Sequence, residues 1–318
     1  MEPPIKFLEN DKCYAMIPLW NIRISSCQDI LVINGIEIVV NHLKDKEDTH
    51  KGGVKVYSDY YLKMELLFNK NDFKTESEFI EWADKECVRK LMGFVTKLRI
   101  YTSGDLITDD CFWILINTDH QIEPSGKKYI PESLQLCILD DLEDFKRVYA
   151  MLGDIESLAD GVTLTRFNSA YNRVGNLHLG EKLIDFVVVL ESLFNKSSGD
   201  LKYKIALRAT HLLYPNKSEE RHELFKFIGE CYNLRNELVH GKKLTNKDLE
   251  NIEHKSRGLQ KIVERIIAKA LDLFGNVKED EIDKVLIIGR APVATRRRSN
   301  YIMAGYLRPR YRSRDFEG

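Results

Sequence analysis

The amino-acid pattern changes near residue 155, and this change limits the folds that the chain can adopt. Before it, short apolar runs alternate with turn residues, whereas beyond it apolar residues recur at helical spacing. Strands and helices in separate blocks are typical of α+β proteins, and 318 residues are enough for two ordinary domains. We therefore predict an α+β fold: a mixed helix-and-strand domain over residues 1–154, an all-α bundle over 155–289 and a basic tail over 290–318.

The first 154 residues carry structural signals but no motif with evident chemistry. An Asn-Gly pair at residues 34–35 joins two apolar runs between Ile30 and Val40, which strongly predicts a β-hairpin. The Thr-Glu-Ser-Glu of residues 75–78 has the form of a capping box that opens a helix. Further strands are expected within 54–68 and 111–116, and helices over 75–98 and 140–152. Phosphate-binding glycine loops, catalytic triads and carboxylate–metal constellations are absent from this sequence, so it predicts no chemistry here.

From about Ile155 onward the pattern is helical throughout. Short connections between successive helices predict antiparallel neighbours, as in a bundle. A shorter helical piece is expected at Asp280–Ile288. The five main helices are expected at Leu164–Val174, Gly180–Asn195, Leu201–Leu213, Glu219–His240 and Asn246–Phe274.

A cluster of chemically capable residues lies near the end of the fourth of these helices, in the stretch Tyr232–Gly241. Arg235 can hold phosphate oxygens through its planar fork of donors, and His240 can transfer protons near neutral pH. Gly241 is suited to the position just after a helix, which places His240 in the last turn. On an ideal helix Arg235 and His240 lie about 140° apart and roughly 7.5 Å along the axis. A single site therefore requires either that the arginine swing towards the histidine or that a second subunit complete it.

The segments that surround this stretch, with their order and spacing, resemble the HEPN superfamily, in particular its Apea-like branch. The resemblance covers about Thr163–Gly241. The residues that carry it are Arg166–Tyr171, Leu183–Phe194, Tyr203–Thr210, Glu220-Arg221 and Tyr232–Gly241. Many HEPN proteins are metal-independent endoribonucleases that work as dimers in antiviral defence or toxin systems. The resemblance implies that Arg235, Asn236 and His240 are catalytic, that Glu191 and Arg208 are polar residues packed near them, and that Tyr232 flanks the site.

We therefore expect cleavage of single-stranded or loop RNA. The ribose 2′-hydroxyl would attack the neighbouring phosphate and leave a 2′,3′-cyclic phosphate and a 5′-hydroxyl. His240 would serve as general base or acid, Arg235 would stabilise charge on the phosphate, and Asn236 would hold the histidine or a phosphate oxygen. No His/Cys or carboxylate cluster in the sequence has ligand spacing, so we expect neither a metal nor a cofactor.

A homodimer through the Glu219–His240 helix would bring two such motifs together across a two-fold axis. Six apolar residues of this helix exceed what a narrow inner stripe needs, which favours two covered faces. They are Phe225, Phe227, Ile228, Cys231, Leu234 and Leu238.

Each candidate residue also has a structural explanation. Glu191 interrupts an apolar helix, so we expect it to be buried and paired with Arg208. His240 can act as a helix-end cap, and Asp185 reads as an ordinary boundary charge. The alternative function is a non-catalytic module that binds a nucleotide, RNA or a partner's phosphate through Arg235 and His240. In either case the first domain would sense a ligand or bind a regulatory partner, by analogy with defence proteins.

The positive charge of the chain is concentrated in its tail. Residues 290–314 hold eight arginines and no acidic residue, and removing these charges from the net charge of −1 leaves −9 for the rest. Tyrosines interleaved with the arginines favour contact with RNA. A solvated extension, or a segment folded over the acidic body, are the alternatives. The residues expected to bind RNA are Arg296, Arg297, Arg298, Arg308, Arg310 and Arg312.

Cysteine usage and hydropathy favour a cytoplasmic protein. The six cysteines are scattered without a Cys-x-x-Cys pair, as expected of buried thiols in a reducing compartment. The amino terminus lacks the plan of a signal peptide, and the longest apolar run, Phe186–Leu190, is too short to span a bilayer.

Overall fold

The structure, a computed structural model, contains an antiparallel sheet with its helices and a separate group of long helices, which confirms the α+β class. It describes residues 12–25, 30–40, 48–50, 53–57, 60–109, 113–116, 127–130, 134–153, 162–174, 178–194, 200–215 and 218–274. The expected helix at Asp280–Ile288 and the basic tail lie outside these residues.

Eleven strands occur in the described residues, and six of them form the main sheet. They are β1 (Cys13–Trp20), β2 (Ile22–Ile24), β3 (Ile30–Ile33), β4 (Ile36–Val40), β5 (Asp48–His50), β6 (Gly53–Tyr57), β7 (Tyr60–Leu66), β8 (Ile107–Thr108), β9 (Trp113–Ile116), β10 (Lys127–Ile130) and β11 (Cys137–Leu139). The main sheet has the order β3-β4-β7-β1-β8, and β9 also pairs with β1. There are two further small sheets. One has the order β10-β6-β5, and the other pairs β11 with β2.

The predicted hairpin is confirmed as β3 and β4, with Ile33 opposite Ile36. Asn34 and Gly35 both have positive φ angles, 50° and 76°. That conformation matches the type I′ turn, in which both central residues have positive φ and which suits the twist of the flanking strands.

No strand was predicted at Cys13–Trp20, yet β1 has partners on both edges although it contains Pro18. Proline normally marks an edge strand because it cannot donate to the ladder. Here β9 pairs with β1 from Cys13 to Met16, and β8 pairs with it at Leu19 and Trp20. Pro18 therefore falls in the gap between two short partners, where no donor is needed on that edge.

The helices of the described residues are α1 (Glu76–Cys87), α2 (Gly93–Thr102), α3 (Leu142–Met151), α4 (Val162–Asn172), α5 (Leu179–Phe194), α6 (Leu201–Leu213), α7 (Ser218–Val239) and α8 (Asn246–Phe274), with a 3₁₀ turn at Lys70–Asp72. A π-helical turn, Val88–Met92, links α1 to α2, so the predicted helix is interrupted and runs further than expected. The hydroxyl of Thr75 accepts from the Glu78 N–H at 3.2 Å, as the capping box predicts.

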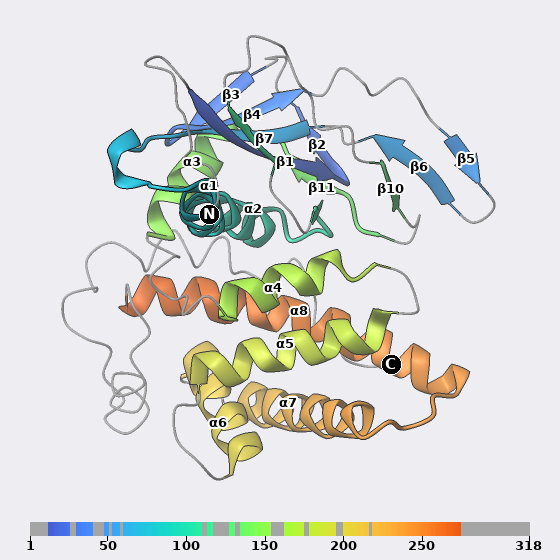
Figure 1. The fold of residues 1–318 in the computed structure, drawn as a ribbon. Helices are drawn as coiled ribbons and strands as arrows, with labels where there is room; N and C mark the ends of the chain where they lie inside the picture. Colours follow the sequence, from blue (N-terminus) through green and yellow to red (C-terminus); the bar gives the residue numbers. More distant parts are fainter. Residues whose placement is uncertain are drawn as a thin grey trace.

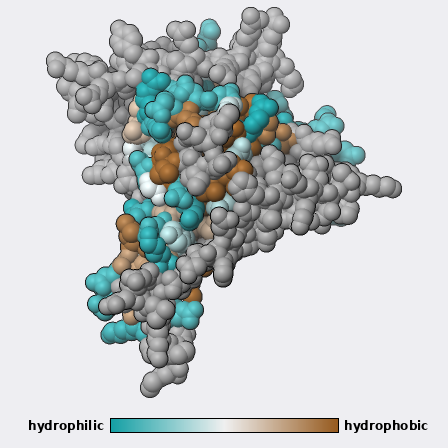
Figure 2. All heavy atoms as spheres, turned by 90° about the horizontal axis from the view of Figure 1, so that it is seen from above, coloured by the Kyte–Doolittle hydropathy of each residue, from teal (hydrophilic) through white to brown (hydrophobic). Residues whose placement is uncertain are grey.

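The chain forms two layers, with the sheet and α1–α3 above the bundle of α4–α8 (Figure 1). Seen from above, the described part of the sheet side shows apolar residues bordered by hydrophilic ones (Figure 2). One core lies between the sheet and α1–α3, with Phe79, Phe94 and Phe145 buried in it, and a second fills the bundle. All five predicted bundle helices are present, within two residues of their expected ends.

Buried polar residues join the two layers. Arg99 of α2 donates to the side chains of Asn168 and Asn172 of α4, and Lys182 of α5 pairs with Asp105 at 3.3 Å. Such groups are costly to bury unless they are satisfied, so these bonds fix how α4 and α5 lie against the upper layer.

The expectation that Asp185 is an ordinary boundary charge was wrong. Its side chain is 2% exposed and pairs with Arg166 at 2.9 Å and with Arg173 at 3.3 Å. Both arginines come from the preceding chain, on and just after α4, which packs against α5. Asp185 thus ties two helices of the bundle together.

Among the described residues, no helix is long and apolar enough to cross a membrane.

Candidate functional site

The motif helix ends as its sequence predicts. Gly241 has a φ of 77°, and its N–H donates to the carbonyl of Leu238, while the Lys242 N–H donates to that of Glu237, both at 3.0 Å. This pair of bonds is the Schellman arrangement, in which glycine takes the left-handed position after the helix. His240 is therefore the C-cap residue, and its side chain is exposed.

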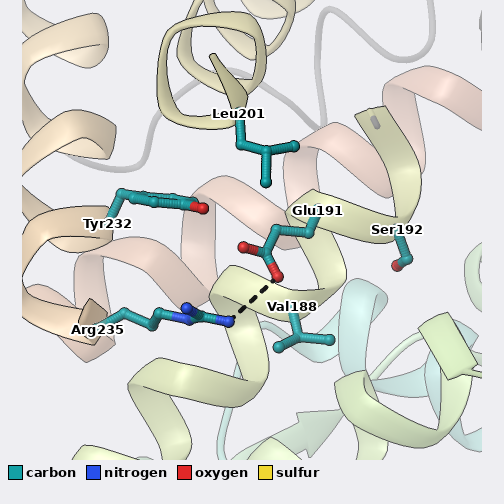
Figure 3. Close-up of a pocket in the computed structure, with 6 residues that line it drawn as sticks. All are labelled: Val188, Glu191, Ser192, Leu201, Tyr232 and Arg235. Carbon is teal, nitrogen blue, oxygen red and sulfur yellow. Dashed lines mark ion pairs between the residues drawn. The ribbon is translucent and has the colours of Figure 1, made fainter. Parts of the chain in front are cut away.

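A surface pocket of about 410 Å³ lies where α5, α6 and α7 meet. Figure 3 shows Arg235 and Tyr232 reaching in from α7, Leu201 from α6, and Glu191 facing Arg235 from α5. The lining residues are Val188, Glu191, Ser192, Leu201, Tyr232 and Arg235. Three of them, Glu191, Tyr232 and Arg235, were predicted as site residues from the sequence.

The guanidinium group of Arg235 is held in place but not saturated with hydrogen bonds. Its Nη1 donates to Oδ1 of Asn236 at 3.0 Å. Its Nη2 lies 3.6 Å from Oε2 of Glu191, which is an ion pair but too long for a good hydrogen bond. The Nε atom is buried and has no hydrogen-bond partner among the described residues. An arginine carries five N–H donors, so several remain for an anion that enters the pocket.

Tyr232 lies near both charged residues of this pocket, Glu191 and Arg235. Its ring centroid is 5.9 Å from the Arg235 guanidinium carbon. Burial raises the pKa of the Tyr232 hydroxyl, and the charge of Glu191 and a hydrogen bond to it raise that pKa further, while Arg235 lowers it. The hydroxyl therefore stays protonated at neutral pH and donates its proton to Glu191.

The predicted burial of Glu191 and its pairing with Arg208 need correction. The Glu191 side chain is 20% exposed, and the structure pairs it with Arg235. Arg208 is buried in α6 and donates through Nη1 to the carbonyl of Phe194, the last residue of α5. Carbonyls at a helix end lack partners within the helix, so this bond stabilises the end of the helix that carries Glu191.

The pocket thus brings together Arg235, Glu191 and Tyr232, with Asn236 beside the arginine. His240 is not one of the six described residues that line it. Within one chain Arg235 and His240 therefore do not share this pocket, as the helix geometry predicts.

The six apolar residues of α7 do not require a second covered face. Phe227, Ile228, Cys231 and Leu234 are buried in the bundle core, and the other two residues of the set, Phe225 and Leu238, pack against it. The number of apolar residues on this helix therefore does not support a dimer. Near the end of α7, Val239 and Leu244 are exposed.

Three lining residues were missed: Val188, Ser192 and Leu201. Val188 lies three residues before Glu191 on α5, and Ser192 lies four residues after Val188. The spacing of one helical turn was therefore the signal that could have found them. Ser192 is already engaged, because its Oγ donates to the Val189 carbonyl at 2.9 Å and lies 2.7 Å from the Thr163 hydroxyl.

The cysteines that the structure describes are free thiols buried in the two cores: Cys13, Cys87, Cys137 and Cys231. Burial raises the pKa of the last three to about 12, so they are not nucleophiles. Within the described ranges, no group of three or more His, Cys, Asp or Glu side chains is placed to hold a metal ion. The arginines expected to bind RNA, in the tail, lie outside those ranges.

No family model, curated protein or solved structure matches this chain.

Proposed function

We propose that this protein is a HEPN-type endoribonuclease that cleaves single-stranded or loop RNA without a metal ion. The observation that carries the proposal is the state of Arg235. It lines a surface pocket, and among the described residues its Nη2 makes only a long ion pair, 3.6 Å from Glu191. A phosphate oxygen in the pocket would accept from this nitrogen, and a hydrogen bond to a charged group contributes about 1.5–3 kcal/mol.

The chemistry assigns one task to each residue. The 2′-oxygen bonds to phosphorus as its proton passes to a base, and the bond from phosphorus to the 5′-oxygen breaks as that oxygen receives a proton. Arg235 stabilises the charge that grows on the phosphate oxygens, and His240 transfers a proton. Asn236, bonded to Nη1, keeps the guanidinium oriented.

The position of His240 calls for a second copy of the chain. On one helix it lies about 140° from Arg235, and it is not among the described residues that line the pocket. A two-fold pairing at the end of α7 would bring the histidine of one copy to the pocket of the other. The exposed Val239 and Leu244, beside His240, provide apolar surface for such a contact.

The decisive experiment incubates the purified full chain with mixed RNA in excess EDTA. We expect cutting that yields 2′,3′-cyclic phosphate and 5′-hydroxyl ends, and its loss in His240→Ala. Activity that disappears in EDTA and returns with magnesium or manganese contradicts the proposed chemistry. Sedimentation of the same sample tests the dimer, and a monomer that cuts RNA contradicts the composite site.

One observation favours the alternative of a non-catalytic binding module: His240 is exposed and absent from the pocket lining described above. In that case Arg235 and Tyr232 would hold a nucleotide or a partner's phosphate. RNA that stays intact while a labelled nucleotide binds, and binding that is lost in Arg235→Ala but kept in His240→Ala, would establish this module. Under either function we propose that the sheet layer senses a ligand or binds a regulatory partner.

A further inference from the structure

The first turn of α6 carries an exposed aromatic ring close to the pocket. Tyr203 is 57% exposed, and among the described residues it is the single aromatic side chain in the exposed class. Large aromatic rings are usually covered in soluble proteins, so an isolated exposed one is informative. The ring is held in place by an edge-on contact with Phe225 of α7, with centroids 5.6 Å apart and planes at 72°.

The same turn also carries a positive charge, on the residue that follows Leu201. Lys202 is exposed, and its Nζ donates to Oδ1 of Asn233 at 3.1 Å. Asn233 is a neutral amide next to Tyr232, so this bond positions the ammonium group without offsetting its charge. Leu201, the preceding residue, lines the pocket itself. Three successive residues of α6 therefore place a wall of the pocket, a cation and a ring that is 57% exposed within one turn.

The geometry of α7 aligns these features with His240 of the motif, while Arg235 lies on another side of the helix. On an ideal helix Phe225, Gly229, Asn233 and His240 lie within one stripe of about 80°. The first turn of α6 covers the early part of that stripe, because Tyr203 contacts Phe225 and the Lys202 side chain lies near Gly229. Beyond the start of α6 the stripe continues to His240, which is exposed.

We propose that Lys202 and Tyr203 form a docking element for an extended single strand of RNA beside the pocket, an inference that rests on the proposed function. A base stacks on the Tyr203 ring and the Lys202 ammonium contacts a backbone phosphate, while the neighbouring phosphate lies against Arg235. Stacked rings with adjacent cations are the means by which proteins bind single strands without reading their sequence.

The test compares a 12-nucleotide single-stranded RNA with a dinucleoside monophosphate as substrates of the full chain in EDTA. We expect Tyr203→Ala to lower kcat/KM on the 12-mer roughly five- to 150-fold, as the loss of one stacked base implies. The same variant should cut the dinucleoside monophosphate at the wild-type rate. Tyr203→Phe should restore cleavage of the 12-mer, since it keeps the ring.

Lys202→Ala tests the phosphate contact through salt. The slope of log affinity against log salt for the labelled 12-mer should become shallower by about 0.7, the value for one phosphate of a single strand. The matched control is Lys85→Ala, which removes an exposed lysine from α1 in the other layer and should leave the slope unchanged. Thermal melting verifies that each variant is folded.

Failure of this inference is distinguishable from failure of the proposed function. If the wild type cuts the 12-mer and Tyr203→Ala cuts it equally well, the docking element is overturned and the nuclease stands. If nothing is cut but Tyr203→Ala loses affinity for the 12-mer, the docking element stands and the nuclease fails. Uncut RNA with affinity indifferent to Tyr203 overturns both and points to a protein partner for the ring.

Discussion

Two arginines of this chain occupy opposite states. Arg99, fully buried between the layers, uses all three side-chain nitrogens: Nε and Nη2 donate to the carbonyl of Leu106, and Nη1 to Asn168. Arg235, beside a surface pocket, has one good hydrogen bond, one long ion pair and a buried Nε without a hydrogen-bond partner among the described residues. A guanidinium whose donors are satisfied by its own protein stabilises the fold, whereas one with unused donors is available for a ligand.

The largest effect is expected from removing the side chain of Arg235, the arginine with unused donors. Arg235→Ala should lower RNA cleavage about 10²–10³-fold, the loss typical when one donor to a developing charge is removed. Stability should change little, since few of its donors are engaged. The double variant with His240→Ala should be scarcely worse than either single one, because residues that act as a unit are not additive. Cleavage rates and urea midpoints measured together verify this, and Arg235→Lys tests whether the planar fork is needed.

Arg99→Ala should have the reverse outcome, with a loss of about 3–4 kcal/mol of unfolding free energy, because it breaks a buried network and leaves acceptors unsatisfied. Urea denaturation measures this. Arg257→Ala is the matched control, since that arginine is 54% exposed and forms an ion pair with Glu253 of its own helix. Such a surface pair contributes at most about 1 kcal/mol. Equal losses in the two variants would show that the buried network does not join the layers.

Features that depend on local sequence could be predicted, whereas contacts between distant segments could not. Helical spacing located all five bundle helices, and Asn-Gly located the hairpin, because those signals are local. The motif itself was also local: Arg235 and Asn236 are adjacent, and Gly241 ends the helix. The strand β1 was not predicted, and its place inside the sheet depends on where β8 and β9 stop beside Pro18, which is not a local signal.

The pairing of side chains from different helices was not predictable. Glu191 pairs with Arg235 rather than Arg208 because of the way α5 packs on α7, which no spacing reveals. On α8, Ser256, Gln260 and Glu264 repeat every four residues, a pattern typical of a solvated face. All three are buried in the structure, since α5, α6 and α7 of the bundle and α2 of the upper layer pack against this helix.

The buried carboxyl of Glu264 makes the stability of the fold depend on pH. Burial raises its pKa from 4.5 to about 7, although hydrogen bonds from Tyr171 and then Gln260 lower it; Asp105 raises it and Lys182 lowers it. The folded protein therefore keeps this proton at pH values where the unfolded chain has lost it. The contribution of Glu264 to stability is largest below about pH 4.5 and falls by roughly 3 kcal/mol as pH rises to 7 and above.

Glu264→Gln isolates this contribution, because the amide oxygen still accepts from Tyr171 and nothing titrates. Its urea-derived stability relative to the wild type should rise between pH 4.5 and 7. A difference that stays constant with pH would mean that the carboxyl is ionised throughout, and that the interface between layers tolerates the charge.

The smallest expected effect concerns the acid opposite Arg235. Its ion pair with Arg235 is long and partly exposed, so Glu191→Gln should cost less than about 1 kcal/mol of stability. The same change removes the charge that, after burial, most raises the pKa of Tyr232. That pKa should therefore fall while remaining above 10.0, because burial still acts on the hydroxyl.

Carbon-13 NMR of labelled tyrosine, assigned with Tyr232→Phe, follows the titration of Tyr232. Tyr171 is the internal control, since its pKa is raised by burial and by Glu264. A Tyr232 pKa that does not move would place Glu191 outside the electrostatics of the pocket, and Arg235 would then face an anion without a competing carboxylate.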